Sequence, residues 1–134
     1  MKALRYLAAP VFVMIFIAGC GGPDRTALAQ QTVVNYWTDV NNAKMTEAYK
    51  LLTPGIQQTR PKGQFTQDMF GFLSSVGAIK PTVSKATVNG DKAVVPVYLY
   101  FVKQQKTLEA YQHLYWYNDG WRITDENGGV SQTK

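Results

Sequence analysis

The feature that most constrains this fold is a change in hydrophobic period near Gly77. Before Gly77, apolar residues recur at three- and four-residue spacing, which is typical of helices that bury one side. After Gly77, apolar and polar residues alternate, and valine, tyrosine and threonine become frequent, which is typical of strands. Helices followed by a run of strands predict an α+β fold in which the helices cover one face of an antiparallel sheet.

Three helices are expected before Gly77, over about residues 25–42, 45–52 and 64–76. Asp24 is the candidate N-cap of the first helix, because its side chain can accept a hydrogen bond from a free backbone N–H. The second helix is expected to stop at Thr53-Pro54-Gly55, since proline and glycine end helices. Residues 53–63 are therefore predicted to form a loop, and Gly77 is the expected C-terminal stop of the third helix.

Four strands are expected after Gly77, over about residues 82–88, 92–103, 106–118 and 121–125. Their predicted turns are Asn89-Gly90, Gln104-Gln105 and Asp119-Gly120. Tight turns at these positions make the following pairs opposite neighbours: Phe101 and Leu108, Leu99 and Ala110, Val95 and Leu114, Ala93 and Trp116, and Trp116 and Ile123. The first hairpin adds Ala86 and Val88 to the same side. All three turns thus predict one apolar face on a four-strand meander.

Three features of the sequence are similar to a known protein family. They are the order of these elements, the segment from Val40 to Leu52, and the closing Asn118-Asp119-Gly120-Trp121-Arg122-Ile123. The chain resembles the nuclear-transport-factor-2-like superfamily, whose cone is also called cystatin-like, and in particular small bacterial lipoproteins of unknown function. The resemblance implies three helices packed on a curved four-strand sheet. It also implies a pocket between helices and sheet, where relatives carry out isomerisation, dehydration or cyclisation. Many relatives have an acidic or small residue where this chain has Lys44.

The amino terminus resembles a lipoprotein signal. Lys2 and Arg5 precede 15 uncharged, mostly apolar residues, a run shorter than the roughly 20 that a spanning helix needs. Ile17-Ala18-Gly19-Cys20 is similar to a lipobox, which implies cleavage between Gly19 and Cys20 and a diacylglyceryl group on the Cys20 thiol. We expect a signal peptide over 1–19, a lipidated cysteine and tether over 20–23, and one domain over 24–134.

Two alternatives to a lipoprotein signal remain: ordinary secretion with cleavage at Ala27-Leu28-Ala29, and an uncleaved anchor. For a lipoprotein, Gly21 after the cysteine favours the outer membrane if the host has one. Otherwise the domain would lie on the outer face of the plasma membrane.

Composition excludes several kinds of site. One cysteine and one histidine cannot supply a disulfide framework or a Cys/His zinc site. Without residues 1–19 the chain holds 12 basic and 9 acidic side chains, a net charge of +3, and residues 60–106 alone carry +5. These lysines are either solvated around the sheet or attract an anionic membrane or wall polymer. No basic run of the recognition type is present, so we expect no nucleic-acid partner, and we expect no cofactor or metal.

The sequence offers two candidate surfaces. One is the outward face of the predicted sheet, a possible surface for a protein partner or a second copy, which carries Tyr98, Tyr100, Tyr111, His113, Tyr115 and Tyr117. Tyrosine also simply suits strands, so a solvated face is the alternative. The other is a possible interior pocket with Tyr36, Trp37, Gln112 and Trp116. There Gln112 is either a core polar group or a residue that orients a ligand.

The lipobox-like segment and these two surfaces together favour a lipid-anchored, non-catalytic domain of the cell envelope that binds a protein or a small envelope ligand. The alternatives are an isomerase- or dehydratase-like enzyme using the interior pocket, with Asp39 and Tyr36 as its nearest candidates, and an accessory lipoprotein of a secretion or conjugation apparatus.

Overall fold

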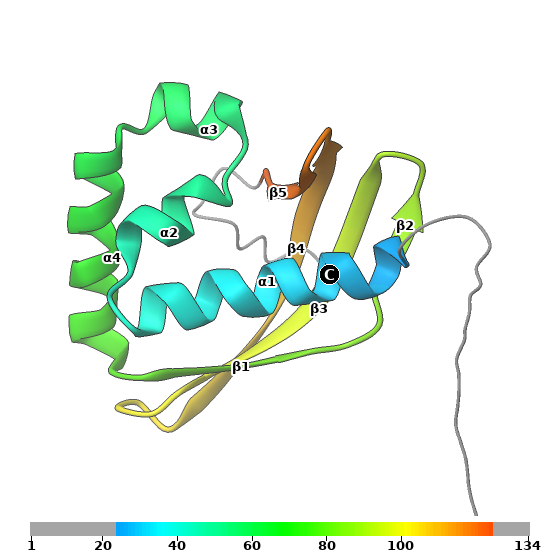
Figure 1. Cartoon of the computed structure of the whole chain (residues 1–134). Coiled ribbons are helices and arrows are strands. Elements are labelled where there is room, and N and C mark those ends of the chain that lie inside the picture. Colours follow the sequence, from blue (N-terminus) through cyan, green and yellow to red (C-terminus); the bar gives the residue numbers. More distant parts are fainter. Residues whose placement is uncertain (1–23, 125–134) are drawn as a thin grey trace, which may run out of the picture.

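The structure is a computed structural model that describes residues 24–124, so the predicted signal peptide, Gly19, Cys20 and the tether lie outside the described residues, as do residues 125–134. Helices precede strands, as predicted, and pack on one side of an antiparallel sheet (Figure 1). The elements are α1 (Arg25–Asn41), α2 (Met45–Lys50), α3 (Pro54–Thr59), α4 (Lys62–Val76), β1 (Ile79–Val83), β2 (Thr87–Asn89), β3 (Lys92–Phe101), β4 (Lys106–Tyr117) and β5 (Gly120–Ile123). The α+β prediction is confirmed.

The helices differ from the prediction at α3. Asp24 caps α1 as expected, its carboxylate accepting a hydrogen bond from the Thr26 N–H at 3.0 Å. The segment 53–63, predicted to be a loop, instead contains α3 and the start of α4. Thr53 caps α3 and Pro54 occupies its first turn, where a proline needs no N–H partner. The Thr-Pro pair that was predicted to end the second helix therefore begins α3, and α2 ends earlier, at Lys50.

The sheet has the strand order β1-β3-β4-β5, and β2 pairs with the other end of β3. The predicted first strand, 82–88, is thus two strands that begin earlier, at Ile79. Val83 lies opposite Val97 and Thr87 opposite Val94, so three residues, 84–86, face two residues of β3. This one-residue excess is a bulge, and it switches the inward positions from odd numbers in β1 to even numbers in β2.

The bulge explains how a proline sits in the central strand β3. Proline lacks an N–H and interrupts a ladder of hydrogen bonds, so within sheets it is confined to edges and bulges. The Ser84 N–H donates to the Pro96 carbonyl at 2.9 Å, so the backbone of Pro96 points toward the bulge. The missing N–H of Pro96 therefore falls where the ladder is already broken.

The predicted register is offset by two residues in each hairpin. The turns are Gly90-Asp91, residues 102–105, and Asn118-Asp119, which corrects the three predicted turns. The predicted pairs were wrong, but an offset of two keeps each side chain on its face, so the predicted apolar face holds. The observed pairs include Leu99 with Leu108, Val97 with Ala110, Ala93 with Leu114, Trp116 with Trp121, and Leu114 with Ile123.

Two edge strands of the sheet, β5 and β1, are partly blocked. At β5, the Ile123 N–H donates to the Leu51 carbonyl at 2.7 Å, and the Thr53 N–H donates to the Ile123 carbonyl at 2.9 Å. At β1, the edge strand contains Pro81, whose lack of an N–H weakens it as a template for another strand. These features make β5 and β1 poor templates for an added strand.

Candidate functional site

Three of the residues predicted to line an interior pocket contact one another in the core. Trp37 Nε1 donates a hydrogen bond to Gln112 Oε1 at 2.8 Å, and both side chains are buried. The Tyr36 ring packs edge-on against Trp37 with centroids 5.0 Å apart. Gln112 is thus a core polar group that holds the α1 indole.

Trp116, the fourth predicted pocket residue, lies elsewhere. It packs edge-on against Trp121, and the Arg25 guanidinium stands 4.2 Å from its ring centroid. Arg25 is at the start of α1, twelve residues and therefore about 18 Å along the helix from Trp37. The predicted interior group is divided between the middle of the core and the amino-terminal end of α1.

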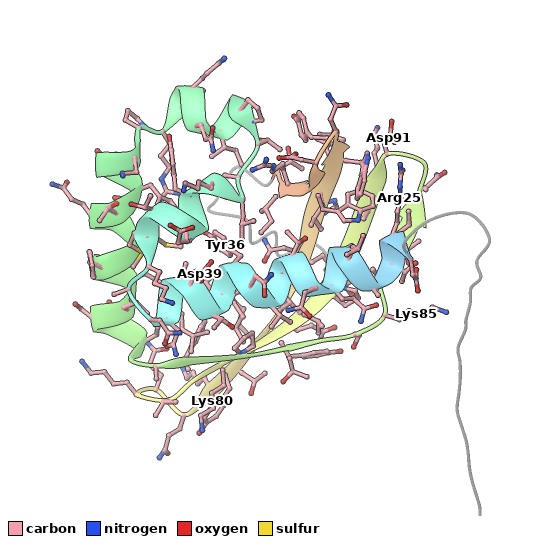
Figure 2. The ribbon with its side chains drawn as sticks, in the orientation of Figure 1. Arg25, Tyr36, Asp39, Lys80, Lys85 and Asp91 are labelled. Carbon is pink, nitrogen blue, oxygen red and sulfur yellow. The ribbon has the colours of Figure 1, made fainter. Side chains whose placement is uncertain are left out.

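No carboxyl or imidazole group is buried within residues 24–124, where the buried polar side chains are Thr53 and Gln112. Asp39, on α1 close to Tyr36, and His113, on β4, are half-buried (Figure 2 shows Asp39). Partial burial raises the pKa of Asp39, Lys44 lowers it, and Glu47 raises it further. The charges that act on Asp39 thus lie at the start of α2, away from Gln112. The same part of the chain contains no cluster of three His, Cys, Asp or Glu residues that could hold a metal ion.

The outward face of the sheet is aromatic. Along β3 and β4 its residues alternate with buried ones, and the register places there all six predicted residues: Tyr98, Tyr100, Tyr111, His113, Tyr115 and Tyr117. We call these six the tyrosine face. Four of its tyrosines are 36–39% exposed, whereas Tyr111 and His113 are half-buried.

Cations outnumber acids among the outward residues of the sheet. Lys80 lies opposite Tyr100, and Lys92 lies opposite Tyr115 with its Nζ 5.7 Å from the ring centroid. On the other side of Tyr115, β5 places Arg122 opposite the same ring. Glu109, opposite Tyr98, is the acidic residue among the outward positions of β3 and β4. Two lysines from the basic middle segment of the chain, Lys80 and Lys92, therefore flank the tyrosine face.

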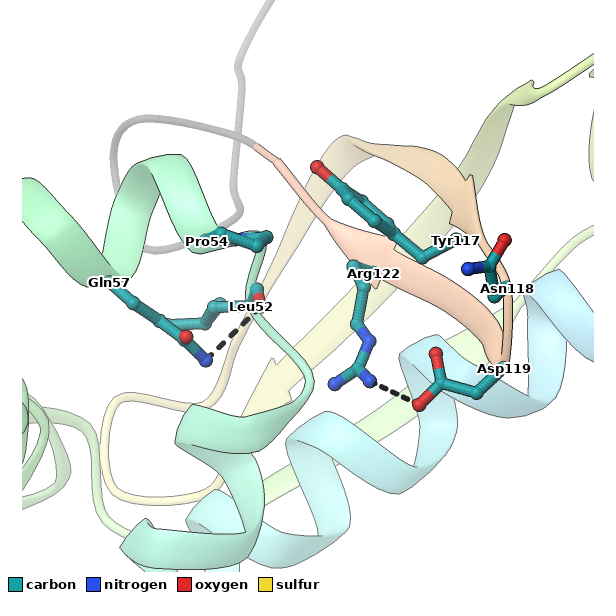
Figure 3. A pocket seen from close by; sticks show the side chains of 7 residues that line it. All are labelled: Leu52, Pro54, Gln57, Tyr117, Asn118, Asp119 and Arg122. Atoms are coloured by element: carbon teal, nitrogen blue, oxygen red, sulfur yellow. Dashed lines mark hydrogen bonds and ion pairs between the residues drawn. The ribbon is translucent and has the colours of Figure 1, made fainter.

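A surface pocket opens at one end of the tyrosine face (Figure 3). It lies between α3 and the β4–β5 hairpin, holds about 380 Å³, and is lined by Leu52, Pro54, Gln57, Tyr117, Asn118, Asp119 and Arg122. Of these, only Tyr117 is a candidate residue from the sequence. The pocket was missed because one of its walls is α3, which was predicted to be a loop. The signal was the Thr53-Pro54 start of that helix.

The charged pair in this pocket is well defined. Arg122 Nη2 donates to Asp119 Oδ2 at 2.6 Å, and Arg122 Nη1 donates to the carbonyl of Lys50, the last residue of α2. The hydrogen bond and charge of Arg122 hold the pKa of Asp119 below its ordinary value. Gln57 Nε2 donates to the Tyr49 and Leu52 carbonyls at 2.9 and 3.3 Å, which fixes the opposite wall.

A second hollow of about 440 Å³ lies on the other side of α3, lined by Thr53, Gly55, Ile56, Thr59, Arg60 and Thr124. Its cation is also paired, because Arg60 donates two hydrogen bonds to Asp68 Oδ2, at 3.1 and 2.7 Å. Of the two hollows, the one beside Arg122 is the one that adjoins the tyrosine face.

Comparisons with known proteins identify the fold. No protein-family model matches the chain, and no curated protein matches it either. Among solved structures, a proposed transpeptidase of nuclear-transport-factor-2-like type from Campylobacter jejuni aligns with a TM-score of 0.58 and 13% identity, covering 72% of this chain and 97% of that one. A protein of unknown function with a cystatin-like fold from Methylobium petroleophilum aligns with a TM-score of 0.51 and 14% identity, over 78% of this chain and 71% of that one.

A proposed dehydratase of the nuclear-transport-factor-2-like family from Streptomyces avermitilis aligns with a TM-score of 0.50 and 13% identity, over 74% of this chain and 92% of that one. At these identities the comparisons show a shared fold. The predicted nuclear-transport-factor-2-like, cystatin-like architecture is thereby confirmed. A fold of this kind hosts several activities, so function has to be argued from the surfaces described above.

Proposed function

We propose that this chain is a lipid-anchored, non-catalytic domain of the cell envelope that binds another protein through its tyrosine face. The observation that carries the proposal is the gathering of partly exposed tyrosines on one side of the sheet, with Tyr98, Tyr100, Tyr115 and Tyr117 each 36–39% exposed. Tyrosine gives a large contact area with little loss of side-chain entropy, and it is enriched at protein interfaces. A partner would cover the rings and leave their hydroxyls available for hydrogen bonds.

The partly blocked edge strands β5 and β1 support binding through a face. A partner that adds a strand needs unpaired N–H and C=O groups along an edge. Leu51 and Thr53 occupy those groups of Ile123 on β5, and Pro81 interrupts β1. The tyrosine face has no such cover within the described residues.

The composition of the core supports a non-catalytic role. Proton-transfer chemistry in an interior pocket needs a carboxyl or imidazole group held in an apolar environment, so that its pKa approaches neutrality. Within residues 24–124 the buried polar side chains are Thr53 and Gln112, which do not titrate in the physiological range. The Trp37 indole donates to the amide oxygen of Gln112, so this polar contact ties α1 to the sheet.

Membrane attachment at Cys20 is the second part of the proposal. It is supported by the lipobox-like Ile17-Ala18-Gly19-Cys20 and by the short distance to the first helix at Arg25. Gly21, Gly22 and Pro23 separate Cys20 from Asp24. Three residues span at most on the order of 10 Å, so the domain would lie against its membrane. In the described part of the chain, no helix is long and apolar enough to cross a bilayer.

Membrane fractionation of cells expressing Cys20→Ala tests the anchor. Loss of the thiol removes the acceptor of the diacylglyceryl group, and two acyl chains are what make lipid anchoring stable. We expect the wild-type protein in the membrane fraction and the variant in the soluble exported fraction. A variant that stays with the membrane would contradict lipid anchoring.

Crosslinking in native membranes tests the tyrosine face. Tyr98→Ser with Tyr115→Ser removes two exposed rings from β3 and β4. We expect the captured partner to decrease about tenfold, as for interface aromatics, while the thermal midpoint changes little. Phe70→Ser is the matched control, because Phe70 is 46% exposed on α4. Equal capture by all variants would contradict the proposal.

Light scattering on the same variants distinguishes a foreign protein from a second copy of this chain. A dimer that dissociates only in the tyrosine double variant would mean that the face binds itself. A monomer in every variant, with loss of the crosslinked partner, would support a heterologous complex.

A further inference from the structure

We propose that the pocket between α3 and the β4–β5 hairpin binds a carboxylate of the partner protein, which takes the place of Asp119 on Arg122. The inference rests on the proposed function, because it concerns the same partner. The pocket and the tyrosine face share Tyr117, so one ligand segment can lie along the face and enter the pocket (Figure 3).

The two charges of the pocket differ in how firmly they are held. The Arg122 side chain is 25% exposed, and it is fixed by its bond to the Lys50 carbonyl at the end of α2. The Asp119 side chain is 69% exposed and lies on the two-residue turn 118–119. The cation is therefore the fixed partner, and the anion is the one that an incoming group can replace. An exposed ion pair of this kind is weak, so the exchange costs little.

The walls suit a ligand that is apolar with a polar end. Leu52 forms a buried floor, and Pro54 and Tyr117 stand on opposite sides of the cavity. Tyr117 pairs with Gly120, which has no side chain, so nothing from β5 covers the ring at that position. A cavity of about 380 Å³ accommodates one side chain or a chain end.

Neutral polar groups at the rim can hold the rest of such a ligand. The Asn118 carboxamide and the Tyr117 hydroxyl make no hydrogen bond to other residues of the described part of the chain. A carboxamide can hydrogen-bond a peptide group through both of its polar groups, because its NH2 donates and its oxygen accepts. A peptide segment therefore fits the rim better than a bare inorganic ion does.

The surrounding charge favours an anion. Across Tyr115 from Arg122, the outward neighbour is Lys92, and its Nζ is 5.7 Å from the ring. Glu109, the acidic outward residue of β4, lies six positions before Tyr115, or about 20 Å along the strand. A guanidinium also binds a carboxylate through two parallel hydrogen bonds, which adds geometric preference.

Nuclear magnetic resonance titration of the mature protein, purified from membranes in detergent, tests the inference with small probes. N-acetyl-phenylalanine presents a chain-terminal carboxylate, and N-acetyl-glutamate α-amide presents a side-chain carboxylate. N-acetyl-phenylalanine amide is the uncharged probe and N-acetyl-lysine amide the cationic one. We expect saturable shifts at the amides of Tyr117, Asn118 and Arg122 with a carboxylate probe only. The stronger of the two carboxylates identifies its source in the partner.

Two variants are expected to change affinity in opposite directions. Asp119→Asn removes the competing carboxylate and should tighten binding severalfold, whereas Arg122→Gln should weaken it about tenfold or more. The matched controls are Asp91→Asn, which removes an exposed ion pair with Arg25, and Arg60→Gln, which removes the pair with Asp68. Both controls should leave the titration unchanged, and the thermal midpoint of each variant shows that it is folded.

Absence of saturation by both carboxylates would overturn the inference. So would saturation by the lysine amide together with weaker binding in Asp119→Asn, since the pocket would then bind a cation. If the partner is still lost in the Tyr98→Ser, Tyr115→Ser double variant after such a result, the tyrosine face stands and only the pocket assignment fails.

Discussion

The hydrogen bond between Trp37 and Gln112 joins α1 to β4 through the core. Replacing Gln112 by Leu leaves the indole N–H unpaired in an apolar interior, and we expect the free energy of unfolding to fall by about 1–3 kcal/mol. Trp37→Phe removes the donor and also leaves space, so it should cost more. Urea unfolding of the two single variants and the double variant measures the coupling. The double variant should lose less than the sum of the singles, and strict additivity would show that the bond contributes nothing.

Two aspartates should change stability with pH in opposite directions. Arg60 and Gln64 hold the pKa of Asp68 below its ordinary value, whereas burial raises the pKa of Asp39. A group whose pKa is lowered in the folded state adds to the free energy of unfolding above its unfolded-state pKa, and this contribution is lost as pH falls. A group whose pKa is raised in the folded state contributes below its unfolded-state pKa, where it is protonated, and this contribution is lost as pH rises.

Urea unfolding at about pH 7 and about pH 3 therefore separates the two groups. Asp68→Asn should be less stable than wild type at neutral pH and should approach it in acid. The free energy of unfolding of Asp39→Asn, relative to that of wild type, should be higher at neutral pH than in acid. The same trend for both variants would contradict these pKa shifts.

At the scale of elements, the end of α4 is tied to the β3–β4 loop. The Lys103 N–H donates to the Val76 carbonyl at 3.0 Å, and Lys103 Nζ donates to the Ser74 carbonyl at 3.0 Å. Gly77 passes through this contact with φ +74°, and a Cβ at that position would lie 2.8 Å from the Cβ of Lys103. The close approach of helix and loop thus requires a glycine.

Gly77→Ala is expected to lower the free energy of unfolding by at least about 1–2 kcal/mol, because it adds both a clash and an unfavourable φ. Gly71→Ala is the control within the same helix, since a Cβ there meets no atom within 4 Å. It should stabilise the protein by about 0.5–1 kcal/mol, because alanine favours a helix over glycine. Thermal unfolding of both variants measures these effects. An unchanged thermal midpoint in Gly77→Ala would show that the glycine is not required.

The sequence predicted elements better than it predicted their junctions. The period of apolar residues identified the buried face of α1 and both faces of β3 and β4, because the regular geometry of a helix or strand fixes which residues share a face. The offset turns and the bulge at 84–86 were not predicted, since they depend on which backbone groups meet across strands. Pro96 was the available signal for the bulge, because a proline inside a central strand calls for an interruption beside it.

At the scale of the whole molecule, the two candidate surfaces differ in how far the sequence could predict them. The tyrosine face needs only alternation along two strands, so its six residues could be named in advance. The pocket beside Arg122 is made by residues near position 52 and near position 120, which meet because Leu51 and Thr53 pair with Ile123. The Thr53-Pro54 helix start marks one wall of the pocket, but no local pattern shows that this wall meets the β4–β5 hairpin.

The contacts of Arg25 decide how the domain would respond to a mechanical pull on its tether. Its guanidinium stands over the Trp116 ring and bonds Asp91 at 3.2 Å, and its carbonyl accepts from Trp121 Nε1 at 2.9 Å. A force applied at Cys20 would therefore pass at the first helical residue into the β2–β3 turn, β4 and β5 together. The sheet would share the strain instead of α1 peeling away alone. In single-molecule stretching between residue 20 and the carboxyl terminus, Arg25→Ala should lower the force of the first unfolding event.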